Sequence, residues 1–319
     1  MCELFGINGA GAVDASAWLE TFFTHGNKNP HGWGMALFQN DPSGHAGFGT
    51  IEKEPVRADK SAYLRARLHQ KLPAASLIAH VREATIGSME YRNTHPFQLR
   101  DQSGRCWTLA HNGTVFESRA LRKYIDRQEG QTDSERILYY LVDKVNEALD
   151  DKRGRFLPGK MVSAEAADGS GRSGEQALHV FGGFPQDPAC PGTPFYECPV
   201  TDCGWNPGLT AQERCRVVDE AVRALSPENK LNLLVYDGEI LYAHTNLHRT
   251  LYRCNPGNVL LFATVPFLTG TCATWEEMPF TSLCAYRDGA QIYQGAPHGF
   301  GYVEDPEKIR SLMMAYAAL

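Results

Sequence analysis

A cysteine directly follows the initiator methionine, and an apolar segment follows the cysteine. Leu4, Phe5 and Ile7 make this segment strand-like, so it can anchor the start of the chain in a core sheet. If Met1 is removed, Cys2 carries both a thiol nucleophile and a free α-amine, whose ordinary pKa of about 7.7–8.0 suits a base. An ordinary buried cysteine is the alternative, because free cysteines are often simply buried.

The 319 residues are enough for one large domain or two smaller ones. A net charge of −6 gives no electrostatic case for nucleic-acid binding, and no apolar run approaches the length of a membrane span. No basic segment followed by an apolar core marks a secretory signal, so we expect a cytoplasmic protein with reduced thiols. Cys190, Cys198 and Cys203 lack the paired spacing of zinc sites, so we predict no metal and no cofactor.

Two blocks of strand patterns flank a group of helix patterns. The second block holds a strong hairpin signal from Leu231 to His244, with Asp237-Gly238 as its turn. Between the blocks, residues 151–208 are rich in Gly, Ser, Lys, Arg and Pro, which predicts an irregular insert. The pattern predicts an α+β protein, with helices layered on antiparallel sheets.

Two stretches place polar residues where a strand is predicted to end. Arg82 follows the apolar strand over 76–81, where a guanidinium can bind a carboxylate bidentately; a solvated surface arginine is the alternative. Asn112 and Gly113 follow the strand over 105–110. Together they offer an amide donor and an accessible backbone N–H, as an oxyanion hole requires, although a plain Asn-Gly turn is the commoner meaning.

A third polar stretch opens the amphipathic helix predicted over 133–149. Thr132 and Glu135 have the spacing of a capping box, and Asp133 between them could also bind a substrate ammonium. In the loop Asn-Thr-His-Pro-Phe, His95 either lines a pocket or is a structural loop histidine.

Five segments occur in a characteristic order: Met-Cys-Glu-Leu-Phe-Gly, His-Val-Arg-Glu-Ala-Thr-Ile-Gly, Asn-Thr-His-Pro-Phe, His-Asn-Gly and Thr-Asp-Ser-Glu. This series resembles the glutaminase domain of class II glutamine amidotransferases, which are N-terminal-nucleophile hydrolases, and in particular the stand-alone YafJ-like type, akin to γ-glutamyl amidohydrolases. The resemblance implies a four-layer αββα sandwich of two antiparallel sheets. It also implies one domain over 1–319, with the catalytic motifs in 1–150, the insert at 151–208 and residues 209–319 completing the sheets.

The resemblance implies that Cys2 is the nucleophile and, through its α-amine, the base, and that Asn112 and Gly113 form the oxyanion hole. Many amidotransferases carry Arg-Gly-x-Asp-[Ser/Ala] after the first helix, where this chain has Pro-His-Gly-Trp-Gly. The arginine that steadies the nucleophile loop elsewhere is therefore missing, and His31 or Trp33 could replace it.

The resemblance also implies that Arg82 binds the α-carboxylate of glutamine or of a γ-glutamyl group and that Asp133 binds its α-amine, with Thr85 and His95 in the substrate pocket. This charge pair argues against acyl-amide hydrolysis of the bile-salt or penicillin type, because an apolar acyl group needs no such clamp. A non-catalytic regulatory or binding subunit on the same fold stays open. So does an ammonia-accepting partner protein, whereas nucleic-acid and membrane partners are not expected.

Overall fold

The computed structural model describes residues 2–39, 49–116, 118–156, 208–267 and 274–317. Contacts divide the chain into two units, Met1–Asn146 with Thr210–Leu319, and Glu147–Leu209. The predicted insert at 151–208 lies mostly outside the described residues, as do the three cysteines considered for a metal site. The functional residues all belong to the first unit.

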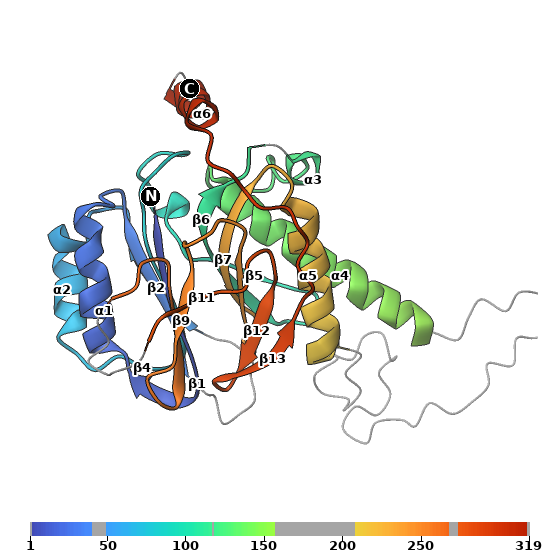
Figure 1. Ribbon diagram of the computed structural model, residues 1–319, viewed down its shortest axis with the longest axis horizontal. Helices are drawn as coiled ribbons and strands as arrows, with labels where there is room; N and C mark the ends of the chain where they lie inside the picture. The colour runs from blue at the N-terminus through green and yellow to red at the C-terminus, as the bar shows by residue number, and fades with distance from the viewer. Residues whose placement is uncertain (1, 40–48, 117, 157–207, 268–273, 318–319) are drawn as a thin grey trace, which may run out of the picture. The chain divides into compact units, whose positions relative to one another are not determined.

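Two antiparallel sheets form the centre of the first unit (Figure 1). Sheet 1 has the order β11-β9-β10-β1-β4-β2-β3. Its strands are β1 (Glu3–Asp14), β2 (Trp33–Phe38), β3 (Gly49–Glu54), β4 (Pro73–Val81), β9 (Tyr252–Cys254), β10 (Val259–Ala263) and β11 (Glu276–Glu277).

Sheet 2 has the order β13-β12-β8-β7-β6-β5. Its strands are β5 (Phe97–Arg100), β6 (Cys106–Thr114), β7 (Lys230–Tyr236), β8 (Leu241–Thr245), β12 (Cys284–Arg287) and β13 (Ala290–Gln294). The predicted hairpin is confirmed: β7 pairs with β8 on one side and with β6 on the other, so the second half of the chain extends a sheet begun by the first.

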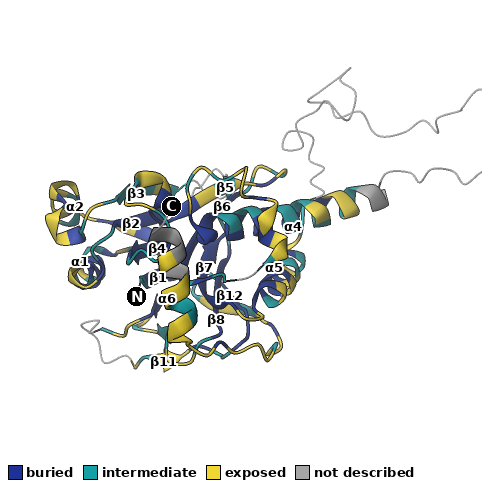
Figure 2. Cartoon of the chain, turned by 90° about the horizontal axis from the view of Figure 1, so that it is seen from above, coloured by how far each residue is buried: buried dark blue, intermediate teal, exposed yellow. Residues whose placement is uncertain are grey.

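Helices cover the outer face of each sheet (Figures 1 and 2). The helices are α1 (Ser16–Phe23), α2 (Ala62–Leu68), α3 (Arg119–Arg122), α4 (Asp133–Phe156), α5 (Ala211–Leu225) and α6 (Pro306–Ala317), with 3-10 turns η1 (Thr24–Asn27), η2 (Ala58–Lys60) and η3 (Tyr91–Asn93). Helices α1 and α2 pack on sheet 1, and α5 and the start of α4 lie on sheet 2. None of the described helices has both the length and the apolarity of a membrane span. The predicted four-layer αββα arrangement is confirmed.

Strand alternation divides the core into two parts. Phe5 and Ile7 of β1 face the helices of sheet 1, and Leu4 faces the apolar layer between the sheets. The sheets pack closely at Gly6, because a Cβ there would lie 2.9 Å from Cδ1 of Leu234 in sheet 2. The alternating sequence of β1 therefore fixes both its register and the distance between the sheets.

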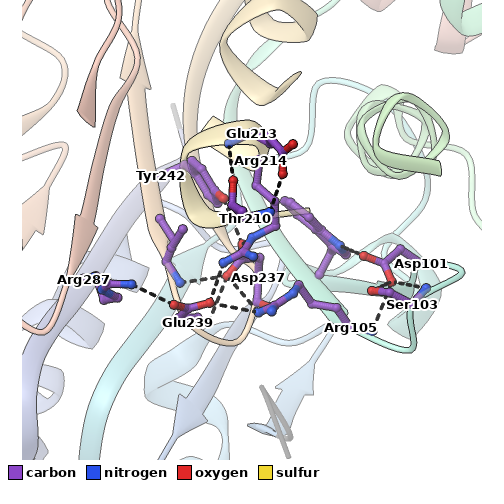
Figure 3. A network of polar contacts seen from close by, with 12 residues as sticks. Asp101, Ser103, Arg105, Thr210, Glu213, Arg214, Asp237, Glu239, Tyr242 and Arg287 are labelled. Carbon is purple, nitrogen blue, oxygen red and sulfur yellow. Dashed lines mark hydrogen bonds and ion pairs between the residues drawn. The ribbon is translucent and has the colours of Figure 1, made fainter. Parts of the chain in front are cut away.

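A buried ion cluster fastens α5 to the β7–β8 turn (Figure 3). Asp237 is fully buried, and its Oδ2 accepts hydrogen bonds from Arg214 Nε at 2.7 Å and Tyr242 Oη at 2.8 Å. Its Oδ1 accepts two backbone N–H groups of its own turn. Glu239 pairs with Arg214 and with Arg287, so every charge in the cluster has an opposite partner.

Replacing Asp237 by Ala should strongly destabilise this unit, because the buried guanidinium of Arg214 then loses its principal partner. Removing one member of a buried ion pair costs about 3–5 kcal/mol. Urea denaturation should show this loss in the free energy of unfolding. The matched control is Asp59→Ala, which breaks a surface pair with Arg57 and should change stability little. Equal midpoints for the two variants would contradict the structural role of the cluster.

Candidate active site

Cys2 lies immediately before β1, at the edge of a small cavity. Its Sγ is 3.2 Å from both the backbone O and the backbone N of Glu83. This placement follows from the register of β1 and β4, in which Glu3 is opposite Val81, so that the residues beyond the two strand ends lie side by side. Burial raises the pKa of the Cys2 thiol to about 11, with the positive charge of Arg82 opposing it.

The cavity has a volume of about 30 Å³ and gathers residues from five segments of the chain. It is lined by Cys2, Arg82, Glu83, Ala84, Thr85, Ile86, His95, His111, Gly113, Thr114, Thr132, Asp133 and Ser134. Six of the nine residues predicted for the site therefore line one cavity. Asn112, His31 and Trp33 are outside the lining.

Arg82 is buried, and in this structure its guanidinium holds a turn. Its Nη2 donates to the carbonyls of Ile86 at 2.8 Å and Gly87 at 3.0 Å, and its Nη1 donates to the carbonyl of Ser88 at 3.0 Å. Burial lowers the pKa of Arg82, while Cys2 and Asp133 oppose the shift. All three acceptors are neutral carbonyls, and among the described residues no carboxylate forms a direct ion pair with Arg82.

Asp133 is the first residue of α4, and backbone amides hold its carboxylate. Its Oδ2 accepts from Val115 N at 2.6 Å and its Oδ1 from Ser134 N at 2.9 Å. The predicted capping box is half formed: Thr132 Oγ1 accepts from Glu135 N at 3.4 Å. The carboxylate of Glu135 instead accepts two N–H groups of the preceding loop.

Asn112 and Gly113 do not form an Asn-Gly turn, because β6 continues through them to Thr114. Asn112 pairs with Asn232 of β7, and this pairing outweighs the local turn preference of Asn-Gly. A Cβ on Gly113 would overlap the carbonyl oxygen of Lys230, so close packing requires glycine here. Asn112 lies next to the lining and is 6% exposed.

His31 supports the segment that contacts the thiol. Its Nδ1 accepts from Ala84 N at 2.9 Å, and its backbone N donates to Arg82 O at 2.9 Å. Burial and the nearby Arg82 lower the pKa of His31, consistent with a neutral ring that accepts at Nδ1. Trp33 instead packs against Phe23 on the helix side of sheet 1, with ring centroids 5.6 Å apart. Of the two candidates for the missing arginine, only His31 touches the loop.

A family model for class II glutamine amidotransferases matches residues 1–179. The chain belongs to this family. Among curated proteins, this amidotransferase is 31% identical to the putative glutamine amidotransferase YafJ of Escherichia coli over 171 residues, which are 53% of this chain and 64% of that one. It is 33% identical to an uncharacterised protein of Methanocaldococcus jannaschii over 147 residues, 46% of this chain and 39% of that one. The matches thus span less than two thirds of these relatives. The resemblance to the YafJ-like type is confirmed.

Solved structures share the fold of this amidotransferase. The glutamine phosphoribosylpyrophosphate amidotransferase of Bacillus subtilis, solved with ADP and GMP, superposes with a TM-score of 0.57 at 14% identity, over 94% of this chain and 50% of that one. A predicted glutamine amidotransferase of Pseudomonas aeruginosa superposes with a TM-score of 0.51 at 15% identity, over 92% of this chain and all of that one.

The sequence analysis did not single out His80 and His111, which form a group of buried histidines with the predicted His95. The His80 and His95 rings pack with centroids 4.2 Å apart. His111 bridges Ser134 Oγ and Lys230 O, each at 3.0 Å. Burial lowers the pKa of all three, to about 3 for His80. His80 and His111 open two of the family motifs, and this position was the one signal that could have marked them.

These histidines should make the protein sensitive to acid. An unfolded histidine titrates near pH 6.5, whereas the buried rings stay neutral, so below pH 6.5 the unfolded state binds more protons. We expect the free energy of unfolding to fall between about pH 6.5 and pH 3, by up to about 1.4 kcal/mol per pH unit for each ring. Urea titrations across this range measure the slope. His80→Leu should reduce it, the exposed control His69→Leu should not, and equal slopes in both would contradict the assignment.

Proposed function

We propose that this amidotransferase hydrolyses the side-chain amide of glutamine, or the amide of a γ-glutamyl compound, to glutamate with release of ammonia or an amine. One observation carries the proposal: the thiol of Cys2, the cation of Arg82 and the anion of Asp133 line the same cavity. A nucleophile beside one positive and one negative group suits the α-end and the γ-carbonyl of an amino-acid substrate.

The substrate's α-carboxylate would bind Arg82 and its α-ammonium would bind Asp133. Oδ2 of Asp133 accepts one hydrogen bond, from Val115 N, and has a further lone pair, so the ammonium can bind there without displacing the backbone amide. Thr85 and His95 also line the cavity and would contact the bound amino acid. This clamp leaves an apolar acyl group without a partner for either charge, which favours glutamine over bile-salt or penicillin substrates.

The reaction requires that Met1 has been removed. The α-amine of Cys2 then takes the thiol proton, and the thiolate attacks the γ-carbonyl carbon. Gly113 and its neighbour Asn112 would supply the hydrogen-bond donors that stabilise the oxyanion. The C–N bond breaks as the amine returns the proton to the leaving nitrogen, and water hydrolyses the resulting thioester to glutamate.

The product ammonia would pass to water or to a partner protein that carries the acceptor. In the B. subtilis amidotransferase the superposition covers only half of the chain, so in that protein the shared fold is part of a longer chain. We propose no cofactor and no nucleic-acid or membrane partner for the reaction. A cytoplasmic location suits the free thiols of the five cysteines in the described ranges.

Cys2→Ala should abolish glutamate formation, and Cys2→Ser should leave at most a trace, because a hydroxyl is far harder to deprotonate than a thiol. A coupled glutamate assay measures both, and Cys106→Ala is the control for a buried thiol. Intact mass of active enzyme should show the loss of Met1. A diazoketone analogue of glutamine should add once, at Cys2. Labelling at Cys106 with Cys2 unmodified would contradict the proposal.

Asp133→Asn tests the clamp, because it removes the charge and keeps the side-chain shape and one of the two oxygens that accept backbone N–H groups. By analogy with a buried ion pair, kcat/KM for glutamine should fall by an amount equivalent to about 2–5 kcal/mol. The monoamide of glutaric acid lacks the α-amine and is the matched substrate. The wild type should prefer glutamine, and the variant should lose this preference. A preference that persists in Asp133→Asn would show that another group binds the ammonium. Arg82→Ala should also weaken glutamine use, although it frees the turn over 86–88 as well.

A further inference from the structure

The loop that carries His95 rests on the edge of sheet 1. Lys53 of β3 donates from Nζ to the carbonyl of Thr94 at 2.6 Å and to the carbonyl of Pro96 at 3.1 Å. These two residues flank His95, whose ring lines the cavity of Cys2. A single side chain from another strand therefore fixes the backbone on both sides of a cavity residue.

Gly34 completes this contact from the neighbouring strand β2. It pairs directly with Lys53 in the sheet register. A Cβ on Gly34 would overlap the carbonyl oxygen of His95 and would lie 2.7 Å from Cβ of Lys53. The loop can therefore reach the sheet only because this residue is glycine.

The ammonium of Lys53 has no ion pair in the described part of the chain. It lies over the rings of Tyr91 and Phe97, at 4.7 and 5.2 Å from their centroids. The acidic groups that act on it at longer range are Glu129 and Glu135, and the Glu135 carboxylate is bound to backbone amides. The direct contacts of this half-buried cation are therefore two carbonyls and two aromatic rings, whereas the lysine of an edge strand ordinarily extends into solvent.

We propose that Lys53 and Gly34 form a cradle that sets the position of His95 in the wall of the Cys2 cavity, so that both are positioning residues for the reaction at Cys2. The kinetic part of this inference rests on the proposed glutamine hydrolysis. The cradle works through the backbone of residues 94–96, and neither cradle residue lines the cavity itself.

The cradle predicts that kcat/KM falls at alkaline pH. Burial lowers the pKa of Lys53 to about 8, with Glu135 and Glu129 opposing the shift. Above that pH the side chain loses its charge, and its hold on the two carbonyls and two rings weakens. kcat/KM should therefore decline above about pH 8. Lys53→Arg should remove this decline, because a guanidinium keeps its proton throughout the range.

Four variants test the cradle at pH 7.5. Lys53→Met removes the donor, and Gly34→Ala pushes the His95 carbonyl away; each should lower kcat/KM by about 10²-fold, the loss expected for a displacement of roughly 1 Å. Lys53→Arg should recover most of the activity lost in Lys53→Met. The control is Gly11→Ala in β1, since a Cβ at Gly11 meets nothing within 4 Å. If Gly34→Ala does not fold, the comparison of Lys53→Met with Lys53→Arg tests the cradle by itself.

Wild-type kcat/KM in Lys53→Met and Gly34→Ala, or an alkaline decline that persists in Lys53→Arg, would overturn the cradle and leave glutamine hydrolysis standing. If the wild type itself does not hydrolyse glutamine, the proposed function fails. The rate at which iodoacetamide alkylates Cys2 then tests whether the cradle positions the cavity wall. The rate should change severalfold in Lys53→Met and not in Gly11→Ala. Equal rates in all variants would overturn it.

Discussion

The pairing of β1 with a strand on each side determines the rest of the site. On one side β4 places the segment after Val81 against Cys2. On the other, Leu4 N donates to Thr264 Oγ1 at 3.0 Å, and Thr264 N donates to Leu4 O at 3.1 Å. A shift of one residue would exchange the two faces of β1 and bring Phe5 between the sheets. The packing of the two cores therefore fixes the position of Cys2 at the start of β1.

The charges of the cavity are held by backbone groups rather than by each other. Arg82 donates to three carbonyls, and Asp133 accepts from two amides, so both are hydrogen-bonded while buried. A buried charge is costly without such partners. Neutral partners satisfy hydrogen bonding but leave the net charge in place. The cavity thus keeps the positive charge of Arg82 and the negative charge of Asp133, which supports the proposed amino-acid substrate.

Sequence reasoning reached the fold and six of the thirteen lining residues, because those six lie in short, ordered motifs. It placed Arg82 and Asp133 correctly at the start of new segments. It could not place Asn112, because local preference suggested a turn, whereas pairing with the distant strand β7 extends β6 through it. It also gave no sign of Lys53, since a lysine in an edge strand has the pattern of a solvent-exposed residue. Such contacts depend on long-range register, which no local pattern contains.

The loop beside Cys2 contacts His31, where the family resemblance leads us to expect an arginine, and this contact has an electrostatic consequence. His31 holds the loop at Ala84 as a neutral acceptor and adds no positive charge near the thiol. Arg82 is then the side chain that most lowers the pKa of the Cys2 thiol, and burial outweighs it, since this pKa rises to about 11. The sulfur is therefore protonated at neutral pH, and attack needs a base at the moment of reaction. An α-amine on the same residue would meet this need without a further side chain, because its ordinary pKa of about 7.7–8.0 leaves a large neutral fraction.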